Sequence, residues 1–87
     1  MTPKKFSTEE AINQLWILRH MANSLSDTKG EAAPEELVHA ACLGRALYWN
    51  ADQINAVRAV TLRGLRGAHV QDHGILKALD RFAEIRG

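Results

Sequence analysis

Apolar side chains recur at intervals of three and four residues in four separate stretches of this chain, and no stretch shows strict apolar–polar alternation. Such intervals place side chains on one face of an α-helix, whereas alternation would indicate a half-buried strand. The chain has 87 residues, a length typical of one domain. The sequence predicts an all-α, small compact bundle of four helices in a single domain of residues 1–87, with helices at about 8–24, 34–49, 52–66 and 73–85 and a flexible N-terminal segment at 1–6.

The small size of the domain also bears on its oligomeric state. A chain of this length buries only about 60% of the surface that its unfolded form exposes, so its core is thin. Small domains often gain stability by association. We therefore expect a homodimer.

The first helix has a clear start signal at Ser7, where the hydroxyl can cap the amide of Glu10. Its apolar stripe consists of Ala11, Leu15, Leu18, Ala22 and Leu25. Trp16, Ile17 and Met21 lie off that stripe, and tryptophan and methionine are favoured in interface cores. We predict that these three residues contact a protein partner; the alternative is that they are core residues, covered by a segment such as the one containing Phe6.

The second helix is predicted to start at Pro34 and to pack through the face that contains most of its apolar residues. Proline suits the first turn of a helix, where its missing N–H is not needed. The predicted packing face consists of Leu37, Ala40, Ala41, Gly44, Leu47, Tyr48 and Ala51. Ala40 and Gly44 are small residues four apart, which lets another helix approach closely. A glycine inside a helix costs about 1 kcal/mol relative to alanine, so Gly44 is expected to have such a packing role.

A break is predicted between the second and third helices, near residues 49–50. The apolar face changes direction here, and Asn50 with Gln53 can cap a new helix. One continuous helix over both segments is the alternative, and it would favour an intertwined dimer. Trp49, at the break, is a further candidate for an interface.

The third helix has two contrasting faces. Its predicted core stripe is Ile54, Val57, Val60, Thr61, Gly64 and Ala68. The opposite face presents Arg58, Leu62, Arg63 and Arg66, an apolar centre with a basic rim. We predict that this face contacts an acidic protein surface, with a nucleic-acid phosphate backbone or a simple solvated face as alternatives.

The fourth helix is predicted to pack through Ile75, Leu76, Leu79, Phe82 and Ala83. Just before it, His69, Asp72 and His73 have spacings that suit a metal ion. The two histidines lack a third strong ligand, so we favour Asp72 as a helix cap with solvated histidines and expect no metal and no cofactor.

The remaining features narrow the class of protein. Cys42 is single and lies in an apolar stretch, as a small core residue would. No apolar run reaches the roughly 20 residues of a membrane span, and no secretory signal is evident. We expect a cytoplasmic protein. Net charge is +1, with residues 44–87 holding seven Lys and Arg against four Asp and Glu.

No phosphate loop or nucleophile motif is present, so catalysis is not expected. The sequence favours a small helical protein–protein interaction module that binds and modulates a larger macromolecule as an adaptor, an inhibitor or a regulatory subunit. A bacterial or phage accessory protein would have this character. The alternative is a small DNA-binding transcriptional regulator that uses the arginines of the third helix.

Overall fold

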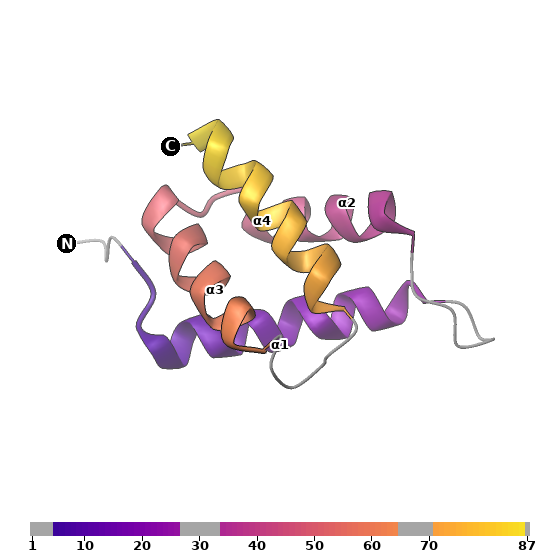
Figure 1. Cartoon of the computed structure of the whole chain (residues 1–87), viewed down its shortest axis with the longest axis horizontal. Helices are drawn as coiled ribbons and strands as arrows, with labels where there is room; N and C mark the ends of the chain where they lie inside the picture. The colour runs from indigo at the N-terminus through magenta and orange to yellow at the C-terminus, as the bar shows by residue number, and fades with distance from the viewer. Residues whose placement is uncertain (1–4, 27–33, 65–70, 87) are drawn as a thin grey trace.

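The computed structural model describes residues 5–26, 34–64 and 71–86, and these form a bundle of helices without strands (Figure 1). The helices are α1 (Thr8–Ser24), α2 (Glu35–Ala46), α3 (Ala51–Gly64) and α4 (Asp72–Arg86). α1 runs along the long axis of the molecule, and α2, α3 and α4 pack over one side of it. The predicted all-α fold is confirmed. No helix in the described ranges is both long and apolar enough to cross a membrane.

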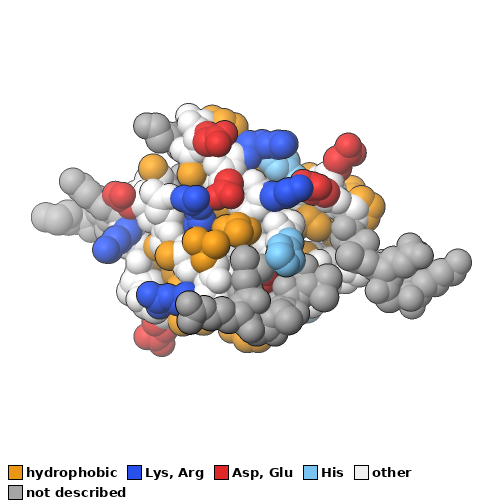
Figure 2. Space-filling view, in the orientation of Figure 1, with side chains coloured by type: hydrophobic (Ala, Val, Ile, Leu, Met, Phe, Trp, Pro, Cys, Tyr) orange, Lys and Arg blue, Asp and Glu red, His pale blue; other side chains and the backbone are white. Residues whose placement is uncertain are grey.

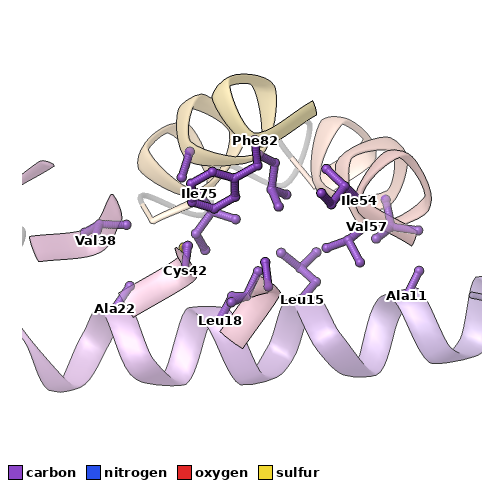
Figure 3. Packing of buried hydrophobic residues seen from close by; sticks show 14 residues of the cluster. Ala11, Leu15, Leu18, Ala22, Val38, Cys42, Ile54, Val57, Ile75 and Phe82 are labelled. Atoms are coloured by element: carbon purple, nitrogen blue, oxygen red, sulfur yellow. The ribbon is translucent and has the colours of Figure 1, made fainter. Parts of the chain in front are cut away.

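One core joins all four helices, and side chains from each helix point into it (Figure 3). Its members are Ala11, Leu15, Leu18 and Ala22 of α1; Val38, Cys42 and Ala46 of α2; Ile54, Val57 and Val60 of α3; and Ile75, Ala78, Leu79 and Phe82 of α4. The stripes predicted for α1, α3 and α4 supply most of these residues. At the ends of the stripes the match is looser, since Leu25 is 37% exposed.

Two side-chain caps set the starts of helices as predicted. The Glu10 amide donates to the Ser7 Oγ at 3.2 Å. At the start of α3 the bonds are reciprocal: the Gln53 amide donates to Asn50 Oδ1 at 2.8 Å, and the Asn50 amide donates to Gln53 Oε1 at 2.9 Å. This capping box starts α3 as a separate helix, so the predicted break between α2 and α3 is confirmed and the alternative of one long helix is excluded.

α2 ends at Ala46, before the predicted residue 49. The Trp49 amide donates to the Ala46 carbonyl at 3.0 Å within the connecting turn. The Trp49 ring packs edge-on against Phe6, with ring centroids 5.3 Å apart, and both side chains lie against the core. Trp49 therefore joins the N-terminal segment to the α2–α3 turn.

The packing face predicted for α2 is wrong. The helix buries Val38, Cys42 and Ala46, which lie on the opposite side from Ala40 and Gly44. The sequence did not decide between the two faces because α2 is apolar on both. Val38, Cys42 and Ala46 are small or branched and uncharged, and they pack against α1 and α4 in place of the leucine-rich face.

An ion pair that sequence reasoning missed lies inside the bundle. Arg19 of α1 and Asp72 of α4 are 8% and 0% exposed, and they form a two-point contact. Asp72 was expected to be the cap residue of α4, but it is the first residue of the helix, and its carboxylate is turned inward to the guanidinium. Nothing in the local spacing could show this, since the partners are 53 residues apart.

Candidate protein-interaction surface

Four of the nine large apolar side chains that are exposed on the described surface lie on or directly after α2, on the side that points away from the bundle. Leu37 is 47% exposed, Leu47 50% and Tyr48 92%. At helical spacing these residues lie with two small exposed ones, Ala40 and Gly44. We call this surface the outward face of α2; it consists of Leu37, Ala40, Leu43, Gly44, Leu47 and Tyr48.

Contacts on both edges of α2 fix this orientation. On the side of α1, Arg45 Nε donates to Gln14 Oε1 at 2.9 Å. On the side of α4, the His39 ring packs against Phe82 with centroids 5.0 Å apart. Between these edges the buried residues seat the helix in the core. Rotating α2 to bury its leucines would break both contacts and expose Cys42, so the outward face belongs to the folded state.

The chemistry of the outward face is uniformly apolar apart from the hydroxyl of Tyr48. The six residues themselves are uncharged, and the exposed Glu36 lies one helical turn before Ala40 at the start of the face. Soluble single-chain domains rarely expose apolar side chains in one contiguous group, and such groups mark interaction sites. Tyrosine is enriched in surfaces that another polypeptide covers.

Gly44 is a further feature of this face, because no contact among the described residues requires a glycine at this position of the helix. A Cβ built at Gly44 would meet nothing within 4 Å. The residue is therefore not required for any contact of α2 with α1 or α4. A glycine here costs the helix about 1 kcal/mol and leaves a shallow gap in its outer surface.

The residues predicted from α1 divide between two sides of that helix. Trp16 is 57% exposed, and its ring lies under the Arg19 guanidinium, 4.9 Å from the ring centroid. Ile17 and Met21 are half-buried, and they follow Gln14 at helical spacing on the side that faces α2. Met21 is about 140° around the helix from Trp16. The three residues therefore do not form one patch, but Ile17 and Met21 extend along the α2 side of α1.

The residues predicted from α3 are also divided. Arg58 forms an ion pair with Asp80 of α4 at the surface, where the two side chains are 42% and 44% exposed. Leu62 is 48% exposed and Arg63 is exposed, while Arg66 lies outside the described residues. Figure 2 shows positive and negative side chains interspersed over the face that contains α3 and α4. This mixed charge does not produce the one-sign surface that phosphate backbones favour.

Other candidate sites are weaker. An open hollow of about 560 Å³ lies between the start of α2 and α4, but its charges are mixed and Lys77 is 3.3 Å from Glu35 within it. Cys42 is buried, and desolvation raises the pKa of its thiol to about 12, which opposes nucleophilic chemistry. Across residues 5–26, 34–64 and 71–86, no three metal-binding side chains gather. His69 of the predicted metal cluster lies outside these ranges.

Sequence reasoning thus identified most of the outward face but expected it to pack inside the bundle. It left out Leu43, and it did not place the face among the partner-binding residues. The signal was present: α2 is apolar on both sides, and in a small bundle only one side of such a helix can be covered by the same chain.

No family model matches this chain, and no curated protein or solved structure is detectably similar to it.

Proposed function

We propose that this protein is a non-catalytic interaction module that binds another polypeptide through the outward face of α2. The observation that carries this proposal is the exposure of Leu37 on α2 and of Leu47 and Tyr48 directly after it, where contacts with α1 and α4 fix the orientation of the helix. Covering these side chains removes apolar surface from water, at about 25 cal/mol per Å². In the cytoplasm, such a module would act on a larger assembly as an adaptor, an inhibitor or a regulatory subunit.

The nucleic-acid alternative rests on the arginines of α3 and has less support. Arg58 is neutralised by Asp80, and acidic side chains lie among the basic ones on this side of the molecule. A DNA-binding surface would be expected to concentrate unpaired positive charge. The affinity of apolar contacts through α2 depends little on salt, whereas phosphate contacts weaken steeply between about 50 and 200 mM salt.

The proposal is tested by site-specific photo-crosslinking in cells that express the full chain. The crosslinking amino acid p-benzoylphenylalanine replaces Tyr48, whose side chain is the most exposed on the face. The matched control places the same amino acid at Ile85 of α4, which is 76% exposed and far from the outward face in sequence. We expect a covalent polypeptide adduct from position 48 and at most a trace from position 85.

Circular dichroism of both purified variants verifies that the helices are retained. If position 48 gives no more adduct than position 85 in the folded protein, the outward face does not bind a polypeptide and the proposal is wrong. An adduct that disappears after nuclease treatment would instead favour the nucleic-acid alternative.

A further inference from the structure

We propose that the polypeptide covering the outward face of α2 is a second copy of this chain, with the two α2 helices packed antiparallel. This inference rests on the proposed function and names the partner for it. It follows from the order of residues along the face, from the gap at Gly44, from the charges at the ends of α2 and from the exposed area.

Four of the six residues of the outward face have the same order of large and small side chains in both directions, whereas Leu43 and Tyr48 would lie opposite Ala41 and Glu36 of the second copy. Leu37 lies three residues before Ala40, and Leu47 lies three residues after Gly44. In an antiparallel pair centred on this pattern, Leu37 lies opposite Leu47 of the second copy, and Ala40 lies opposite Gly44 of the second copy. A two-fold symmetric interface requires such self-complementarity, because the same patch serves on both subunits. A face selected for an unrelated partner has no reason to show it.

The small central pair allows the two helices to approach closely. Ala40 and Gly44 are one helical turn apart, and both are exposed. A Cβ at Gly44 would have no neighbour within 4 Å among the described residues, so on their side the space is open to a residue from outside. A second α2 fills this space, and the interface gives the mid-helix glycine the packing role that the monomer lacks.

Charge at the ends of α2 favours the antiparallel direction over the parallel one. Glu35 and Glu36 lie in the first turn, and Arg45 lies in the last turn. Parallel packing would place Glu36 beside Glu36 of the second copy, at a cost from like charges. Antiparallel packing avoids this contact between like charges, and it places the two helix dipoles in opposite directions, which is favourable.

The exposed area suits a modest but specific dimer. With Tyr48 at 92% and the three leucines at 39–50% exposure, the face offers on the order of 600 Å² per copy, so a pair that covered all of it would bury about 1,200 Å². This area is at the lower end of the range for specific interfaces. We therefore expect a dissociation constant in the micromolar range, on the order of 10 μM.

The test is sedimentation equilibrium of the purified full chain from about 1 to about 500 μM, a range that brackets the expected constant. We expect the mean mass to rise from that of one chain toward that of two. Leu37→Glu should weaken association at least tenfold, since it buries a charge in the pair. Glutamate is well suited to the first turn of a helix, so this variant should keep its fold. Ile85→Glu is the control on α4 and should leave the constant unchanged.

Gly44→Leu distinguishes close packing of the two helices from nonspecific hydrophobic association. Leucine makes the face more apolar and is a better helix former than glycine, and the single chain offers it open space. A merely adhesive surface would associate more strongly with this variant. The proposed dimer should associate at least tenfold more weakly, because the larger side chain holds the two helices apart.

Disulfide crosslinking tests the direction of packing. Mixed chains that carry either Ala40→Cys or Gly44→Cys should form the 40–44 heterodimer faster than either homodimer, because these positions face each other only in the antiparallel pair. The native Cys42 is buried and stays protonated, so it does not compete. Faster homodimer formation would overturn the antiparallel arrangement.

A chain that remains monomeric up to the highest concentration would overturn the inference, as would a dimer that Leu37→Glu and Gly44→Leu leave intact. The crosslinking at Tyr48 distinguishes these failures from failure of the proposed function. A monomer with adducts that contain a different protein leaves the interaction module standing and removes the homodimer. A monomer without adducts removes both.

Discussion

Arg19 donates from Nε to Asp72 Oδ1 at 2.8 Å and from Nη2 to Asp72 Oδ2 at 2.7 Å, which joins the middle of α1 to the first residue of α4. The carboxylate is fully buried, and its hydrogen bonds raise the pKa of Arg19 above the usual value. A planar guanidinium matches a carboxylate in this two-point geometry. The pair therefore fixes the position of α4 with an accuracy that apolar contacts alone do not provide.

Removing one partner of this pair should nearly unfold the domain. Asp72→Ala leaves the buried guanidinium uncompensated, at a cost of about 3–5 kcal/mol, which is close to the whole stability that so small a core supplies. Urea denaturation followed by circular dichroism measures this loss. Asp72→Asn retains the shape and one acceptor, so it should cost less than Asp72→Ala. Equal stability of Asp72→Ala and the native chain would show that the ion pair does not hold α4.

Gly64 and Gly44 should respond in opposite directions to the same substitution. A Cβ at Gly64 would collide with the Asp72 carboxylate and the Arg19 guanidinium, whereas a Cβ at Gly44 meets open space. We expect Gly64→Ala to destabilise by about 1–3 kcal/mol through displacement of the ion pair. Gly44→Ala should stabilise by about 0.5–1 kcal/mol through helix propensity. Thermal unfolding at low protein concentration measures both changes in stability. If the two substitutions change stability in the same direction, the prediction is wrong.

Local signals in the sequence predicted most of the fold. The Asn50–Gln53 capping box separated α2 from α3 because it satisfies backbone groups within four residues, and the structure shows both of its hydrogen bonds. The core stripe of α3 was predicted from periodicity, since Ile54 and Val57 belong to one apolar stripe on one side of that helix. Such features depend on neighbours in the chain and can be derived without the tertiary structure.

Features that depend on distant residues were not predictable in this way. The ion pair of Arg19 was missed because its partner Asp72 lies 53 residues away, on the last helix. Periodicity also did not decide which side of α2 packs against the bundle, because the helix has apolar residues on opposite sides, such as Cys42 and Leu47. Only the packing against α1 and α4 settles which side is exposed, and the candidate site therefore could be identified only from the structure.

Cys42 should resist thiol reagents in the folded protein. Burial raises the pKa of its thiol to about 12, so almost no thiolate is present at pH 8. We expect labelling by 5,5′-dithiobis(2-nitrobenzoic acid) at pH 8 to be slow in buffer and rapid in denaturing urea. Rapid labelling under native conditions would show that α2 opens away from the core.

The same thiol links stability to alkaline pH. The folded-state pKa lies above the ordinary value of 9.0, so above about pH 9 the unfolded chain loses a proton that the folded chain retains. This difference favours unfolding, and the contribution of the protonated thiol declines by up to about 1.4 kcal/mol per pH unit between the two pKa values. Cys42→Ala should remove this part of the decline. Parallel pH profiles for the native chain and the variant would contradict the assignment.

Trp16 separates the surface predicted from α1 from the outward face of α2. Its ring supports the Arg19 guanidinium from the exposed side of α1, and a cation–π contact at such a site contributes about 0.5–1 kcal/mol. Trp16→Ala should therefore lower stability by roughly that amount, and Trp16→Phe by less, while sedimentation still shows association through α2. A variant that fails to fold would assign Trp16 to the core. A folded Trp16→Ala chain that no longer associates would instead place the interface on α1, since Trp16 lies about 140° around that helix from Met21 on its α2 side.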